Sequence, residues 1–113
     1  MIEATIITYL KDKTSAAKNV FAERPKNPPA KYLIVEKTGS DRLDRIDRAT
    51  IAIQSICGTL AEAASLNEEV KTKMYAIVSE NSISACRLNS DYNYTNQGTK
   101  EYRYQAVFDI THY

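Results

Sequence analysis

The sequence is poor in the residues from which metal and catalytic sites are most often built. It has one histidine (His112), two cysteines, three glycines and no tryptophan among 113 residues. A zinc site needs several converging His, Cys or carboxylate ligands, and Cys57 and Cys86 lack metal-ligand spacing. Three widely spaced glycines cannot build a phosphate-cradling loop. We therefore expect no metal, no cofactor and no enzymatic activity.

The residue pattern also gives little support to nucleophilic or general acid–base catalysis. An activated serine or cysteine needs an adjacent base, and the only imidazole is next to the last residue. Paired carboxylates remain an alternative on sequence grounds. However, the acidic residues gather in two places where basic residues are interleaved with them, Asp41–Asp47 and Glu68–Glu69. This interleaving favours solvated surface over a catalytic pair.

Charge and hydropathy exclude further classes of protein. The formal net charge is +1, whereas a duplex-DNA binder normally has a basic excess on one face. No apolar run approaches the roughly 20 residues that span a bilayer, and the N-terminus lacks the basic segment of a signal peptide. With 43% hydrophobic and 26% charged residues, the chain is typical of a single globular domain over 1–113. We expect the two cysteines to be buried thiols, with a disulfide as the alternative.

Hydrophobic periodicity predicts two helices. Apolar residues at helical spacing indicate an amphipathic helix over residues 1–11. Thr59 and Glu62 have the spacing of a capping box, which predicts a longer helix from there to residues 79–81. Leu66–Asn67 interrupts its pattern and marks a potential bend. The expected apolar stripe of this second helix is Leu60, Ala63, Ala64, Val70, Met74, Ile77 and Val78.

Alternating patterns predict two antiparallel hairpins. The first joins 31–38 to 48–57 through a charged connector, 39–47, expected to form a long tip. The second joins 82–95 to 100–113 and turns at 96–98. A short strand, 20–24, precedes a proline-rich link. The fold class expected is α+β: an antiparallel or mixed sheet of two long hairpins, with an N-terminal helix and one long central helix packed on a face.

The C-terminal stretch from residue 92 to 113 contains five of the eight tyrosines. Base stacking by Tyr102 and Tyr104 beside Arg103 is one hypothesis. Their side of the strand continues as apolar residues, which favours a core face instead. Tyrosine is enriched in protein interfaces, so the other polar and aromatic positions are typical of a docking surface. The candidate interface residues are Arg42, Asp44, Arg45, Arg48, Tyr92, Tyr94, Lys100 and Arg103.

Four stretches in this order carry a family resemblance: ERPKNPPAKYLIVEKTGS, DRATIAIQSIC, TLAEAASLNEEVK and RLNSDYNYTNQGTKEYRYQAVFDITHY. Together they resemble the small tail-terminator (tail-completion) proteins of long-tailed bacteriophages and prophages, particularly those of Gram-positive hosts. The resemblance covers nearly the whole chain from residue 20. No stretch is a catalytic signature, so the combination alone makes it specific.

The resemblance implies a structural function in the virion tail or neck, with assembly in the host cytoplasm. Such proteins are α+β domains that form a ring, typically a hexamer, on the last ring of tail-tube protein. They end tail polymerisation and provide a surface for the head-completion proteins of the neck. DNA passes through the channel without specific binding, and no membrane is involved. The alternatives are another head–tail connector component, or a small cytosolic domain that binds a ligand or nucleic acid.

Overall fold

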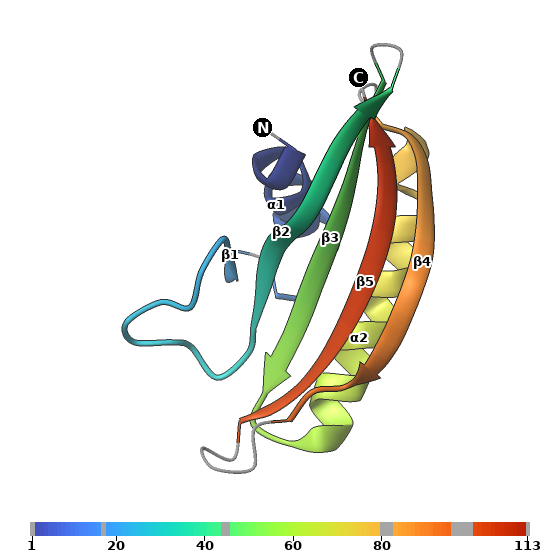
Figure 1. Cartoon of the computed structure of the whole chain (residues 1–113). Coiled ribbons are helices and arrows are strands. Elements are labelled where there is room, and N and C mark those ends of the chain that lie inside the picture. The colour runs from blue at the N-terminus through green and yellow to red at the C-terminus, as the bar shows by residue number, and fades with distance from the viewer. Residues whose placement is uncertain (1, 17, 44–45, 80–82, 96–100, 113) are drawn as a thin grey trace.

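The computed structural model describes residues 2–16, 18–43, 46–79, 83–95 and 101–112. Two helices pack on one face of a five-stranded mixed sheet (Figure 1), which confirms the α+β fold class. In chain order the elements are α1 (Ile2–Lys13), β1 (Val20–Phe21), β2 (Tyr32–Leu43), β3 (Ile46–Cys57), α2 (Leu60–Tyr75), the 3₁₀ helix η1 (Ile77–Ser79), β4 (Ile83–Asn93) and β5 (Tyr102–His112).

The strand order in the sheet is β1-β2-β3-β5-β4. The four long strands pair antiparallel, so both predicted hairpins are present and β5 joins them. The expected short strand is confirmed but covers only β1. It pairs parallel with β2 at Val20 opposite Leu33 and Phe21 opposite Ile34. Beyond Ile34, the outer edge of β2 has no neighbouring strand among the described residues.

The prediction of a connector over residues 39–47 is wrong. β2 extends to Leu43 and β3 begins at Ile46, and their pairing runs from Gly39 opposite Thr50 to Leu43 opposite Ile46; residues 44–45 lie outside the described part of the chain. A bulge between Lys37 and Gly39 absorbs one extra residue. Past the bulge, residues of opposite charge face each other across the strands, which stabilises the pairing. These charged residues therefore extend a ladder and do not form a loop.

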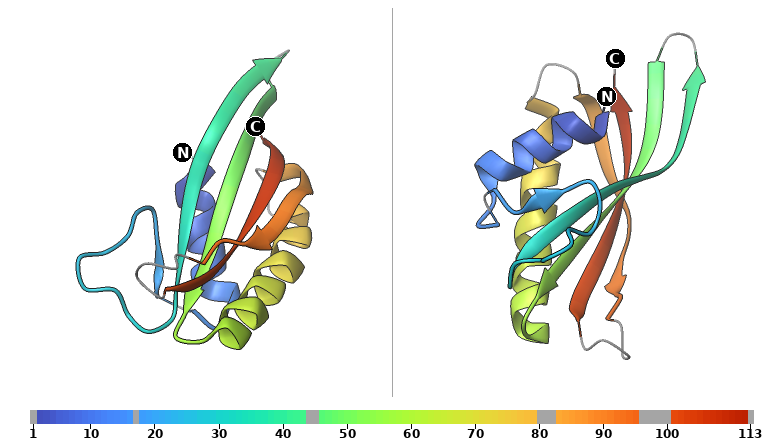
Figure 2. Two further views of the ribbon diagram at one scale, coloured as in Figure 1. Left: turned by 60° about the horizontal axis from the view of Figure 1, so that its bottom comes forward. Right: turned by 90° about the vertical axis from the view of Figure 1, so that its left-hand side faces the viewer.

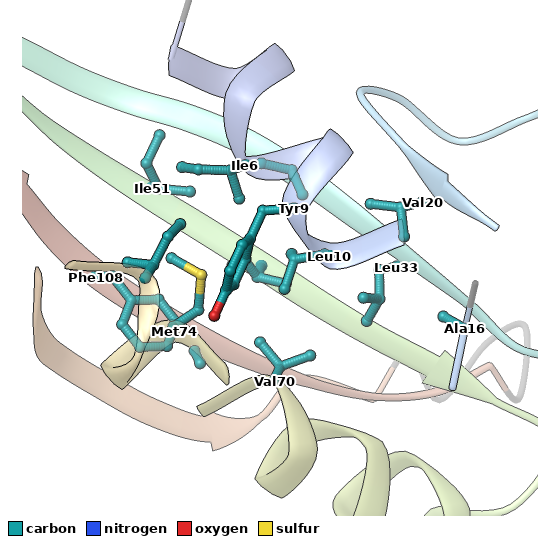
Figure 3. Packing of buried hydrophobic residues seen from close by; sticks show 14 of the residues in the cluster. Ile6, Tyr9, Leu10, Ala16, Val20, Leu33, Ile51, Val70, Met74 and Phe108 are labelled. Carbon is teal, nitrogen blue, oxygen red and sulfur yellow. The ribbon is translucent and has the colours of Figure 1, made fainter. Parts of the chain in front are cut away.

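Helix α1 packs against the sheet through Ile2, Ile6, Tyr9 and Leu10, which are buried. Its end is fixed to α2, because the Tyr9 hydroxyl donates a hydrogen bond of 2.6 Å to the carbonyl of Lys73. Figure 3 shows Tyr9 between the two helices and the sheet. The helix matches the predicted one and extends two residues past its expected end, residue 11.

Helix α2 starts as predicted, because the Thr59 side chain accepts a hydrogen bond of 3.2 Å from the backbone N–H of Glu62. Its buried residues are Ala63, Leu66, Asn67, Val70 and Met74. These positions follow one regular helical face, so the expected interruption at Leu66–Asn67 is wrong. Leu60 and Val78, expected in the stripe, are exposed.

The α-helix ends earlier than residues 79–81. Ala76 caps it by donating to the carbonyl of Lys73 at 3.1 Å, and Ser79 donates to Ala76 at 3.2 Å. These i to i−3 hydrogen bonds tighten the chain into η1. Asn81 lies outside the described residues.

The main core lies between the helices and the sheet. Alternate residues of the central strands point into it, including Ile51 and Ile53 of β3 and Phe108 of β5, as the alternation predicted. Tyr102 and Tyr104 are half-buried and pack against this core, at its more polar end. On the opposite face a smaller cluster, Tyr32, Ile34 and Ile56, packs under Phe21.

Both cysteines are free thiols; Cys57 is buried and Cys86 only half-buried. Burial raises the pKa of the Cys57 thiol, and raises that of Cys86 to about 11. Cys57 lies opposite Tyr102 and Cys86 opposite Ile110, at the two ends of β5. That separation far exceeds the roughly 4.4–6.8 Å between Cα atoms that a disulfide requires. The alternative of a disulfide within the chain is therefore wrong.

Candidate functional site

The sheet face opposite α1 and α2, here called the open face, carries four of the five candidate residues that the structure describes. The two rotated views in Figure 2 show the helices together on the other side. Strand register assigns alternate residues to the open face: Arg48 pairs with Thr111, Thr50 with Asp109 and Gln54 with Gln105. Because the intervening residues fill the core, the polar ones are directed outward. The open face is therefore polar, apart from the apolar cluster of Tyr32, Ile34 and Ile56 at the end where β2 begins.

The open face is hollowed near the end where β2 and β3 extend furthest. The hollow has a volume of about 570 Å³, and residues of all four long strands line it. They include Ser40 and Asp41 of β2, Arg48 of β3, Asp109 of β5 and Arg87 of β4. Since β2 and β4 are the outermost long strands, the sheet is concave across its whole width here.

The charges that line the hollow are paired. Arg48 donates two hydrogen bonds to Asp41, Nε to Oδ1 at 2.7 Å and Nη2 to Oδ2 at 2.8 Å. The hydrogen bond and charge of Asp41 raise the pKa of Arg48. Arg87 lies 3.5 Å from Asp109, and Asn89 also donates to that carboxylate at 3.1 Å. The hollow is thus polar but locally balanced in charge.

A second pair lies on the other face of the same hairpin end. Arg42 donates to Asp47 through Nε at 2.6 Å and Nη2 at 3.2 Å. The hydrogen bond from Arg42 is the largest influence on Asp47 and lowers its pKa. The candidates Arg42 and Arg48 therefore sit on opposite faces of one hairpin. Asp44 and Arg45 lie outside the described residues.

Three other candidates meet at the opposite end of the open face, in what we call the tyrosine–arginine patch: Tyr92, Tyr94 and Arg103. The rings of Tyr92 and Tyr94 are edge to face, with centroids 5.9 Å apart. The Arg103 guanidinium carbon lies 4.8 Å from the centroid of the Tyr94 ring, and its Nε donates to the Tyr94 carbonyl at 2.7 Å. Tyr92 and Tyr94 are 41% and 45% exposed. Lys100 lies outside the described residues.

The sequence did not reveal which residues support the patch. Gln105 donates a hydrogen bond to the Tyr92 hydroxyl, and Gln54 accepts one of 3.5 Å from Arg103. These contacts depend on β5 lying between β3 and β4. The available signal was composition: β5 contains the apolar run Ala106–Phe108, whereas β4 is largely polar, as is common for an edge strand.

The strand order leaves two edges for contact. β4 is the last strand on one side of the sheet, and β1 covers only the start of β2 on the other. The stretch of β2 past Ile34, residues 35–43, is called here the free edge of β2. Within the described residues, no helix is long and apolar enough to cross a membrane, and no group of three or more His, Cys, Asp or Glu could hold a metal ion.

The chain matches no protein-family model and no curated protein.

Proposed function

We propose that this protein is a structural virion-assembly subunit, a tail terminator of a long-tailed phage or prophage. It caps the tail tube, ends tail polymerisation and provides the surface on which the head is joined. The observation that carries the proposal is a concave sheet face that no described helix covers, combined with two outer edges, β4 and β2 beyond Ile34, that pair with no further strand among the described residues. The sequence resemblance supplies the biological setting.

The geometry suits repeated protein contacts. Unpaired strand edges present rows of N–H and C=O groups that readily pair with another chain. The tyrosine–arginine patch adds aromatic and guanidinium groups, which dominate binding energy in many interfaces. Tyr92 and Arg103 lie on paired strands, and the Tyr94 backbone N–H donates to the Arg103 carbonyl at 2.8 Å, so little conformational entropy is lost when they bind. The expected partners are other copies of the chain in a hexameric ring, the tail-tube protein and a head-completion protein.

In this assignment the patch contacts a protein partner and the chain catalyses no reaction. The hollowed end of the open face lines the channel through which DNA passes, which fits the paired charges there, because paired charges do not retain DNA as a basic strip would. The subunit functions in the tail or neck of the virion, after assembly in the host cytoplasm.

Binding to purified tail tubes tests the proposal. The variant Tyr92→Ala/Tyr94→Ala should bind tubes at least about tenfold more weakly than the native chain, in line with loss of interface hot-spot residues. Tyr75→Ala is the matched control, because Tyr75 is 53% exposed on α2, on the helical side. It should bind normally. Cosedimentation with tubes measures the affinity, and electron microscopy locates the bound protein.

Two results would contradict the proposal. The first is absence of binding to tubes by the native chain. The second is salt-sensitive binding to single-stranded nucleic acid that is lost in Tyr94→Ala, which would favour a nucleic-acid-binding domain.

A further inference from the structure

The two exposed edges of the sheet run in opposite directions. β2, β3, β5 and β4 alternate in direction because each neighbouring pair is antiparallel. Figure 1 shows β2 and β4 on opposite sides of the sheet, pointing opposite ways. If a second copy is placed beside the first in the same orientation, its free β2 edge meets β4 of the first as an antiparallel neighbour. The sheet can then continue from copy to copy without reversal.

We propose that copies of this chain join by antiparallel pairing of β4 with the free edge of β2 in the next copy. This inference rests on the proposed function and names its subunit contact. Because the two edges are different surfaces, the contact is head-to-tail. Such contacts generate a closed ring when the rotation per copy closes, and a filament when it does not.

Charge selects one register for this pairing. When Asp41 of one copy lies opposite Arg87 of the next on the open face, Lys37 falls opposite Asp91 on the helical side. Both contacts are between opposite charges, which favours cross-strand pairing. Arg87 and Asp41 are well exposed, with side chains 82% and 56% accessible. Their present partners, Asp109 and Arg48, would complete a cluster of alternating charges.

The irregularities of the two strands agree with the same register. β2 has its bulge between Lys37 and Gly39, and β4 has one between Leu88 and Ser90. With Asp41 opposite Arg87, the two bulges overlap in the new ladder, because Thr38 and Gly39 lie opposite Ser90 and Asn89. Each strand then has one extra residue in the same stretch. Side chains beyond the bulges stay in phase, each on its own face of the sheet.

The ends of the strands agree as well. In this register Asn93, the last residue of β4, lies opposite Val35, the first residue of the free edge. Any further slide in that direction would bring β4 against β1, which already pairs with Leu33 and Ile34. Charge, bulges and strand ends are separate features, and they select one alignment.

Pairwise disulfide trapping tests the inference in the full-length chain. In a Cys57→Ala/Cys86→Ala background, equal amounts of two single-cysteine chains are mixed and mildly oxidised. Asp41→Cys with Arg87→Cys, and Glu36→Cys with Tyr92→Cys, should give linked dimers because these positions face each other. The swapped mixtures, Asp41→Cys with Tyr92→Cys and Glu36→Cys with Arg87→Cys, are the matched controls. They should remain unlinked, since their positions lie at opposite ends of the contact.

The inference is overturned if the swapped mixtures form linked dimers. It is also overturned if none of the four mixtures forms them. Should the cysteine-free background not fold, charge reversal in the native chain replaces it. Asp41→Arg and Arg87→Asp should each weaken self-association in sedimentation velocity by at least fivefold, and the two variants mixed should recover it. Failure of that recovery counts against the register.

The experiment also separates the two proposals when it is repeated with tail tubes present. Linked dimers that do not bind tubes would retain the edge contact and reject the tail-terminator function. Tube binding by chains that never link, even on the tube, would retain the function and reject the edge contact.

Discussion

At the scale of single residues, one carboxylate ties the segment after β1 to the sheet. Glu101 accepts a hydrogen bond of 2.9 Å from the buried Tyr32 hydroxyl and one of 3.3 Å from Arg24. Burial raises the pKa of Glu101, but the hydrogen bond from Tyr32 and the charge of Arg24 outweigh it and lower the pKa below its ordinary value. The ionised carboxylate is thus favoured by folding.

This arrangement predicts a pH-dependent effect of Tyr32→Phe. At pH 7 the variant should lose about 1.5 kcal/mol of unfolding free energy, the typical contribution of a hydrogen bond to a charged group. Glu101 has a lowered pKa when folded, so its contribution is present above the unfolded-state pKa, near 4.5, and is lost as pH falls through the folded-state pKa. The difference between variant and native chain should therefore shrink at pH 3.

Urea unfolding at pH 7 and pH 3 measures the effect. Tyr75→Phe, an exposed tyrosine with the same chemical change, should be neutral at both pH values. An equal loss for Tyr32→Phe at the two pH values would show that the Glu101 charge is not involved.

The candidate site was only partly predictable from residues. The alternation of apolar and polar residues correctly predicted that Tyr102 and Tyr104 face the core, because that signal is contained within one strand. The stacking of Arg103 on Tyr94 was not predictable, since it depends on the register between β4 and β5. Register across a turn is set by pairing and packing of the whole sheet, and residue types reveal it poorly.

At the scale of secondary-structure elements, the prediction from sequence failed where a run of charged residues was interpreted as a solvent-exposed loop. The composition of residues 39–47, with Gly39 and charges of both signs, favoured a loop. In the folded sheet the same charges are cross-strand partners, Asp41 with Arg48 and Arg42 with Asp47. Their favourable effect appears only once the strands are aligned. The helices were predicted better, because their signals, a cap and a periodic face, are contained within the element.

The start of α2 gives a prediction at this scale. Thr59→Ala should lower the free energy of unfolding by about 1 kcal/mol, because the N–H of Glu62 loses its side-chain acceptor. Thr72→Ala makes the same change at an exposed position inside α2, where alanine favours the helix, and should cause no loss. Thermal or urea unfolding compares the two. Equal losses would indicate a general cost of removing threonine instead of a capping effect.

At the scale of the whole molecule, the essential feature is which strand of the second hairpin lies inside the sheet. β5 pairs with β3, and β4 is left at the edge. The sequence predicted both hairpins but not this order. The polar content of β4 and the apolar run of β5 are consistent with it, since an inner strand is covered more completely than an edge strand.

Self-association through the edges predicts that stability depends on protein concentration. Anything that binds only the folded state stabilises it by mass action. Raising the concentration a hundredfold should raise the melting temperature of the native chain by a few degrees, roughly 4 °C per kcal/mol for a domain of this size. Arg87→Asp should show a smaller rise. A melting temperature that is constant over this range, in calorimetry or fluorescence, would contradict the predicted association.

The helical layer has a further consequence for such an association. Because α1 and α2 lie on one side of the sheet only, the molecule has a helical layer on one side and strands without a helix on the other (Figure 2). Identical head-to-tail contacts turn each copy by the same angle, and that angle decides how many copies complete a circle. The curvature of each sheet contributes to the angle, and it depends on the side chains packed beneath the helices. Residues far from every contact, such as Ile6 and Val70 in the core, would then determine the diameter of the assembly.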